Sequence, residues 1–189
     1  LPNILAISRD IKLIDPKNGY PNNLLSLDPS SLSDLGKKYI DETKWARSCK
    51  PFFIDKMPNN FVHIGLIKLI LPKAKIIDAR RNPMDACFSC FKQYFAKGQH
   101  FTYDLDDIAR YYKDYIRLMD YWKKLFPNEI FTINYEDIIN NPNEIIKDLL
   151  EFCNVEFEEN CLNFHQSKRP VKTASSEQVR QPMYKTGLD

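Results

Sequence analysis

The fold of this chain is decided by residues 74–83, which have the sequence Ala74-Lys-Ile-Ile-Asp-Ala-Arg-Arg-Asn-Pro83. Residues 74–80 form a short β-type run that ends among two arginines. Asn82 can cap the next helix, and Pro83 fits its first position. Asp85, three residues after Asn82, completes an approximate capping box. These features predict a strand that passes directly into a helix.

Two further β-type runs, Pro51–Asp55 and Glu129–Tyr135, lie on either side of this stretch, and helical patterns separate the runs. The expected helices are Asn3–Lys12, Asp28 to about Ser48, about Asn60–Leu71, Pro83–Phe95, about Asp104–Phe126 and Pro142–Cys153. Strands that alternate with helices indicate a parallel sheet with helices on both faces. The predicted fold class is therefore α/β, as a single three-layer α/β/α domain over residues 1–189.

The longest expected helix, about Asp104–Phe126, carries a seam of apolar residues at alternating spacings of three and four. The seam consists of Leu105, Ile108, Tyr112, Tyr115, Met119, Trp122 and Phe126. This spacing places one apolar stripe along a helix. We therefore expect the seam to pack in the core rather than to form a ligand site.

Composition excludes several classes of protein. The chain has 189 residues, of which 43% are hydrophobic and 13% aromatic, so it is not a disordered or low-complexity chain. Its 27 basic and 25 acidic residues give a net charge of +2 and form no basic stripe, so no nucleic-acid partner is expected. The longest apolar stretch, around Ile64–Leu71, is interrupted by Gly65 and Lys68, so no membrane span is expected.

The cysteines indicate a compartment and argue against metal binding. Five is an odd number, which favours a reducing environment over a disulfide framework. Cys87 and Cys90 form a CxxC pair, but no second pair stands at zinc spacing. We therefore expect buried, inert thiols and no metal site, rather than redox or metal chemistry. The first residues also lack the regions of a signal peptide, which favours a cytoplasmic location.

The glycines bear on phosphate binding. There are only five, widely separated, so neither type of Gly-rich phosphate loop can be formed. Ligands of an open parallel sheet bind beyond the carboxyl ends of its strands. At the end of residues 74–80, Arg80, Arg81 and the positive end of the next helix form an anion site without glycine. Ser89 lies about 9 Å further along that helix, so it reaches an anion only on the helix flank. Alternatively, both arginines form surface ion pairs and Ser89 is a neutral helix residue.

Four motifs resemble those of the sulfotransferase family. They are Phe53-Ile-Asp-Lys-Met-Pro-Asn-Asn-Phe61, Ala79-Arg-Arg-Asn-Pro-Met-Asp-Ala-Cys-Phe-Ser89, Asn134-Tyr-Glu-Asp137 and Thr173-Ala-Ser-Ser-Glu-Gln-Val-Arg-Gln-Pro182. The chain is most similar to the bacterial branch that is often joined to tetratricopeptide repeats and is related to tyrosylprotein sulfotransferases. The resemblance implies a P-loop NTPase-like fold and a metal-independent enzyme. Such an enzyme transfers a sulfuryl group from 3′-phosphoadenosine 5′-phosphosulfate (PAPS) to a hydroxyl or amine.

The resemblance also implies which residues bind the donor. Arg81 and Ser89 stand at the spacing with which the family binds the 3′-phosphate. Tyr135 matches a tyrosine that contacts the nucleotide. Ser175 and Gln178 belong to the segment that covers the nucleotide.

Two residues match catalytic positions. Lys56 matches the lysine held against the leaving phosphate, and Ser175 matches a serine that also approaches the sulfate. Sulfuryl transfer, like phosphoryl transfer, should build charge on the leaving oxygen in a loose transition state. One fixed cation there can contribute about 3–4 kcal/mol. Considered without the resemblance, a lysine at the end of a strand is more often simply solvated than functional.

The sequence departs from the family at its start. The family's first strand, its phosphosulfate loop and the following helix, on the order of 30 residues, have no counterpart among residues 1–189, and we expect them to belong ahead of Leu1. We therefore expect a truncated domain with weak or no activity. The family's base is a glutamate in a Gly-x-Glu-Leu-Pro stretch, which would lie just ahead of Leu1. His63 and His165 remain as substitutes, although such histidines are more often structural.

Two other functions stay open at this point. One is a P-loop kinase-like phosphotransferase whose anion pocket serves another phosphate, and the other is a non-catalytic nucleotide-binding or scaffold module. The implied partners are a nucleotide donor and an unidentified acceptor, which could be a small molecule, a glycan or a peptide tyrosine. Upstream tetratricopeptide repeats would belong to a longer protein.

Overall fold

The structure, a computed structural model, describes residues 3–14, 18–47, 50–95 and 98–166. Within the chain, Leu1–Ala74 and Lys75–Asp189 form two separate units. The prediction of a single domain over residues 1–189 stays a prediction. No helix among the described residues is long and apolar enough to cross a membrane.

The first unit is built from helices. It contains α1 (Asn3–Ile14), α2 (Pro29–Glu42) and α3 (Ile64–Ile70), with 3₁₀ segments at Asn22–Ser26, Lys44–Ala46 and Pro58–His63. The start of α2 is as predicted, because Asp28 Oδ1 accepts a hydrogen bond from the Ser31 backbone N–H at 2.7 Å. The helix ends at Glu42, before the predicted end near Ser48.

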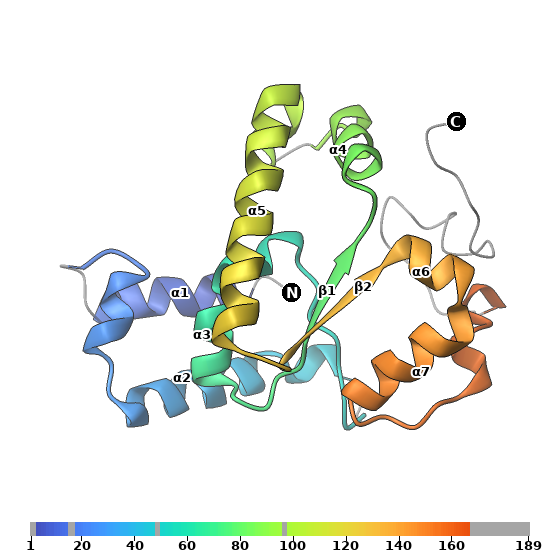
Figure 1. Cartoon of the computed structure of the whole chain (residues 1–189). Coiled ribbons are helices and arrows are strands. Elements are labelled where there is room, and N and C mark those ends of the chain that lie inside the picture. The colour runs from blue at the N-terminus through green and yellow to red at the C-terminus, as the bar shows by residue number, and fades with distance from the viewer. Residues whose placement is uncertain (1–2, 15–17, 48–49, 96–97, 167–189) are drawn as a thin grey trace. The chain divides into compact units, whose positions relative to one another are not determined.

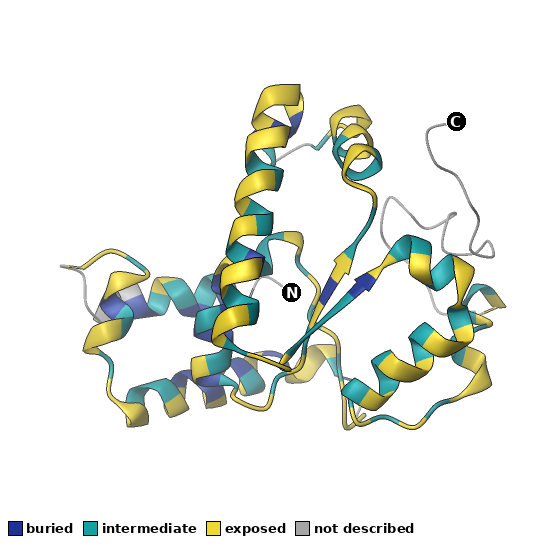
Figure 2. Cartoon of the chain, viewed as in Figure 1, coloured by how far each residue is buried: buried dark blue, intermediate teal, exposed yellow. Residues whose placement is uncertain are grey.

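The apolar faces of these helices form the core of the first unit. Figure 2 shows the buried positions in dark blue. The buried apolar side chains are Ile4, Ile7, Ile11, Leu35, Tyr39, Ile64, Leu66, Ile67 and Ile70. The spacing of three and four residues in α1 gives one buried stripe. The backbones of α2 and α3 also approach closely, because a Cβ added to Gly36 would lie 2.2 Å from the Ile70 carbonyl oxygen.

The second unit contains a small parallel sheet and its helices (Figure 1). Its elements are β1 (Ile76–Arg80), α4 (Pro83–Lys92), α5 (Leu105–Leu125), β2 (Ile130–Asn134), α6 (Tyr135–Asn140) and α7 (Pro142–Phe152), with 3₁₀ segments at His100–Tyr103, Glu159–Cys161 and Phe164–Gln166. The two strands pair in parallel, with Ile76 opposite Ile130 and Arg80 opposite Asn134. The predicted parallel pairing is confirmed.

Helices cover both faces of this sheet, as predicted. Asp78 and Thr132 are opposite each other on one face, and the Tyr115 hydroxyl of α5 donates a hydrogen bond to Asp78 Oδ1. On the other face, the Phe131 ring packs against Phe152 of α7, with ring centroids 5.4 Å apart. Figure 1 shows α5 and α7 on opposite sides of the two strands. The chain is therefore of the α/β class, although mostly helical.

The seam along α5 packs largely as expected. Ile108 and Met119 are only 3% and 1% exposed, and the aromatic members of the seam are half-buried. The Trp122 and Phe126 rings stack, with centroids 5.9 Å apart. Leu105, the first residue of the helix, differs and is 55% exposed.

The prediction of a strand at Pro51–Asp55 is wrong. Among the described residues, the sheet consists of β1 and β2 alone. A β-type run forms a strand only beside a partner strand, and this run is held by side chains from α2 and the residues after it. The Tyr39 hydroxyl donates a hydrogen bond to Asp55 Oδ2 at 2.6 Å. The Arg47 guanidinium lies 4.7 Å from the Phe53 ring centroid.

One helical prediction also needs correction, and one helix was missed. The segment predicted as one helix over about Asn60–Leu71 is a 3₁₀ segment followed by α3, and His63 separates the two with φ −109° and ψ 9°. The short helix α6 was not predicted. Glu136 and Asp137 lie in its first turn, where negative charge is favourable.

Candidate functional site

The carboxyl ends of β1 and β2 bring two predicted site residues together. Parallel pairing places the residues that follow each strand at the same edge of the sheet. Arg81 follows β1, and Tyr135 follows β2 as the first residue of α6. The Arg81 Cζ atom lies 5.6 Å from the centroid of the Tyr135 ring, which is cation–π geometry. The Arg81 side chain is 35% exposed, so solvent reaches it.

Asp85 holds the Arg81 guanidinium on the α4 side. Its Oδ2 lies 3.1 Å from Arg81 Nη2, and its side chain is 11% exposed. A capping box has two reciprocal hydrogen bonds, and the predicted one from the Asn82 backbone N–H to Asp85 is wrong. The Asp85 carboxylate pairs with Arg81 instead. The Asn82 N–H donates to Glu136 Oε1 at 2.9 Å.

Asn82 caps α4, as predicted. Its Oδ1 accepts hydrogen bonds from the backbone N–H groups of Met84 at 2.9 Å and Asp85 at 3.4 Å. The Ala86 N–H donates to the Asn82 carbonyl at 2.9 Å. Pro83 has no N–H. The first turn thus satisfies its own donors, and the helix contributes its dipole rather than these N–H groups to any anion nearby. Of the anion site expected at the positive end of this helix, the helix therefore supplies the dipole alone.

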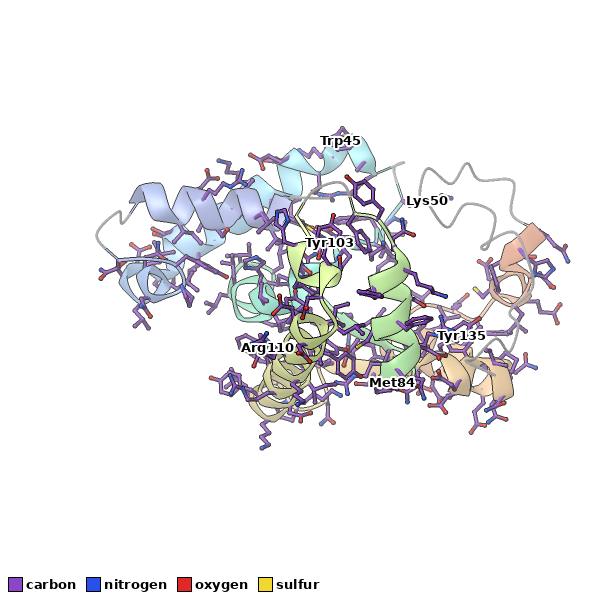
Figure 3. The ribbon with its side chains drawn as sticks, turned by 90° about the horizontal axis from the view of Figure 1, so that it is seen from above. Trp45, Lys50, Met84, Tyr103, Arg110 and Tyr135 are labelled. Carbon is purple, nitrogen blue, oxygen red and sulfur yellow. The ribbon has the colours of Figure 1, made fainter. Side chains whose placement is uncertain are left out.

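Ser89 is exposed on α4. It follows Asp85 by four residues, and residues at this spacing lie on the same side of a helix. Asp85 in turn contacts Arg81. The flank that carries Ser89 is therefore the one that carries the arginine contact. Figure 3 labels Met84 and Tyr135, which mark the starts of α4 and α6.

Arg80 belongs to a buried cluster and not to this edge. Its Nε and Nη2 atoms each lie 2.8 Å from Asp78 Oδ2, and the Asp78 side chain is only 4% exposed. The Tyr115 hydroxyl donates to the other carboxylate oxygen, and Lys123 Nζ lies 3.7 Å from Oδ2. Of the two adjacent arginines, one is structural and the other lies at the edge of the sheet. The sequence feature that could have indicated this cluster is Asp78, a carboxylate inside a β-type run.

The other predicted site residues are Lys56, Ser175 and Gln178. Lys56 belongs to the first unit and is exposed. It directly follows Asp55, whose carboxylate accepts a hydrogen bond from the buried Tyr39 hydroxyl. Ser175 and Gln178 lie outside the described residues.

The two candidate histidines have structural environments. His63 is 7% exposed, and the Tyr20 hydroxyl lies within 2.8 Å of its Nδ1. Burial lowers the pKa of His63 and raises that of Tyr20 to about 12. The half-buried His165 ring packs edge-on against Phe164. A histidine that serves as a base must reach the acceptor, so the burial of His63 argues against that role.

Cys87, Cys90 and Cys153 are unpaired and half-buried. Burial raises the pKa of each thiol, which lowers its reactivity. Among the described residues, no group of three or more His, Cys, Asp or Glu side chains could hold a metal ion.

A comparison with known families matches residues 18–159 of this chain to the description "Sulfotransferase family". The chain belongs to the sulfotransferase family. The matched range includes Lys56, Arg81, Ser89 and Tyr135, whereas Ser175 and Gln178 lie beyond it.

A relative is similar to this chain over almost all of its length. An uncharacterized protein of Aquifex aeolicus (strain VF5) is 37% identical over 179 residues. The alignment covers 93% of this chain and 23% of the relative. The chain thus spans less than a quarter of that relative's length.

Proposed function

We propose that this sulfotransferase-family chain binds PAPS and takes part in transfer of its sulfuryl group to a hydroxyl or amine acceptor. The observation that carries the proposal is the contact of Arg81 with Tyr135 at the carboxyl edge of the sheet. Membership of the family supports the reaction class. The proposed overall fold is the three-layer, P-loop NTPase-like fold of such enzymes.

Arg81, Ser89 and Tyr135 are the proposed donor-binding residues. A guanidinium can bind a phosphate through two parallel N–H groups. Asp85 and the Tyr135 ring hold the Arg81 guanidinium from two sides, so little side-chain freedom is lost when a phosphate binds. The Ser89 hydroxyl, on the same flank of α4, would donate to the same 3′-phosphate.

Besides the donor PAPS, the proposed reaction needs an acceptor, a cation and a base. The acceptor oxygen or nitrogen attacks sulfur, and the bond between sulfur and the bridging phosphate oxygen breaks. The acceptor proton passes to a base, and 3′-phosphoadenosine 5′-phosphate (PAP) leaves. Lys56 would stabilise the charge on the leaving oxygen. Ser175 and Gln178 are proposed to cover the nucleotide, with Ser175 beside the sulfate.

Calorimetry with PAP and with AMP tests the donor site directly, because the two differ only in the 3′-phosphate. We expect the parent protein to prefer PAP. Replacing Arg81 with Ala should weaken PAP binding about 10- to 100-fold, the effect of losing a hydrogen bond to a charged group. AMP binding should change little. Arg110→Ala is the matched control, because Arg110 lies exposed on α5 in a surface pair with Asp107.

Three results would contradict the proposal. Equal binding of PAP and AMP by the parent would show that the protein has no site for the 3′-phosphate. An unchanged PAP preference in Arg81→Ala would show that another residue reads this phosphate. A preference for ATP over PAP would favour a kinase-like phosphotransferase.

A further inference from the structure

Two neighbouring contacts connect the segments that follow β1 and β2. One is between Arg81 and Tyr135, and the other is between the next residues, Asn82 and Glu136. Arg81 lies over the Tyr135 ring, and the next residue of each strand end makes the second contact, from the Asn82 backbone N–H to Glu136 Oε1 at 2.9 Å. The partners in this hydrogen bond are 54 residues apart in the chain. The two contacts together fix how one strand end sits on the other.

The Asn82 N–H needs a partner from outside its own helix. As the cap of α4, Asn82 precedes the hydrogen-bonded turns, and helix caps leave such donors without an intrahelical acceptor. In a capping box the acceptor would come from Asp85, but that carboxylate pairs with Arg81. Glu136 therefore takes the place of the local acceptor and links α6 to the start of α4.

We propose that Glu136 is a positioning residue for donor binding. Its carboxylate holds the Asn82 backbone, and this hydrogen bond keeps the preceding residue, Arg81, on the Tyr135 ring in the arrangement that receives the 3′-phosphate. This inference rests on the proposed function. Glu136 itself does not contact the donor in this scheme.

The hydrogen bond to Asn82 needs an acceptor oxygen on residue 136 but not a negative charge. A carboxylate close to a bound phosphate repels it, so the negative charge alone would weaken donor binding. An amide oxygen accepts the same hydrogen bond without that charge. Glu136→Gln should therefore keep the link, whereas Glu136→Ala should remove it.

Calorimetry with PAP on the full natural protein tests these variants. Loss of one net hydrogen bond predicts that Glu136→Ala binds PAP about five- to tenfold more weakly than the parent. Glu136→Gln should bind PAP at least as tightly as the parent. Asp137→Ala is the matched control, since Asp137 supplies the next carboxylate in the same turn but pairs with Asn134. Its PAP affinity should remain within twofold of the parent.

A double variant distinguishes a positioning role of Glu136 from a general disturbance of the fold. In an Arg81→Ala background, adding Glu136→Ala should cause no further loss of PAP affinity, because Glu136 acts through Arg81. If Glu136→Ala fails to fold, Glu136→Asp replaces it, because the side chain shorter by one methylene withdraws the carboxylate from Asn82 and should weaken binding similarly.

The inference is overturned if Glu136→Ala binds PAP like the parent, if Glu136→Gln is as weak as Glu136→Ala, or if Asp137→Ala is equally impaired. Additive effects in the double variant would also overturn it. The proposed function fails separately, when the parent shows no preference for PAP over AMP or when Arg81→Ala binds PAP normally.

Discussion

His63 shows how burial sets the chemistry of one residue in this chain. Its ring is 7% exposed and hydrogen-bonded to Tyr20, and burial lowers its pKa. A lowered pKa in the folded state means that the unfolded chain binds the proton more readily. The neutral ring therefore stabilises the fold fully above the unfolded pKa of about 6.5, and this contribution is lost as the pH falls.

We accordingly expect the free energy of unfolding to fall between pH 7 and pH 5, by at most about 1.4 kcal/mol per pH unit from this one group. His63→Gln should show a smaller fall. Urea unfolding at both pH values measures the effect. His100→Gln, at an exposed histidine, is the control and should keep the pH dependence of the parent. An identical fall in His63→Gln and the parent would assign the dependence to other groups.

At the scale of elements, Gly36 controls the contact of α2 with α3. A Cβ there would lie 2.2 Å from the Ile70 carbonyl oxygen, which belongs to a backbone that cannot rotate away. Gly36→Ala gains about 1 kcal/mol of helix propensity. We still expect net destabilisation of about 1–3 kcal/mol, because overpacking must separate the two helices.

Thermal unfolding of matched variants measures this prediction. Gly19→Ala is the control, because a Cβ at Gly19 meets nothing within 4 Å and should change stability by less than about 0.5 kcal/mol. A Gly36→Ala variant as stable as the parent would show that the two helices can move apart at little cost.

Local signals predicted the elements whose determinants are local. Asp28, Asn82 and Asp104 each cap the helix that follows. Asn82 was predicted as a cap, and Asp28 and Asp104 were predicted as the approximate starts of their helices. The run Pro51–Asp55 was mistaken for a strand because its partners, Tyr39 and Arg47, are side chains that a β pattern does not reveal.

At the scale of the whole molecule, the sequence predicted that Arg81 and Tyr135 lie at one edge but not which contacts hold them there. The rule for parallel sheets was enough to place Arg81 and Tyr135 at one edge. The link from Asn82 to Glu136 spans 54 residues, and the Tyr115 hydrogen bond to Asp78 spans 37. Such pairs depend on the register of β1 with β2 and on the rotation of α5, which no local pattern specifies.

The last prediction concerns the proposed role of Lys56. If Lys56 and the proposed donor-binding residues Arg81 and Ser89 all act on the donor, PAP must contact the residues around each of them. PAP should therefore slow backbone hydrogen exchange at residues 53–57 as well as at residues 79–89. At 100 times its Kd, the slowing can reach about 100-fold where exchange requires an opening that releases PAP. Exchange measured by mass spectrometry with and without PAP tests this.

In Lys56→Ala, protection should weaken at 53–57 and persist at 79–89. Protection confined to residues 79–89 in the parent would contradict the role of Lys56, while leaving the 3′-phosphate site in place.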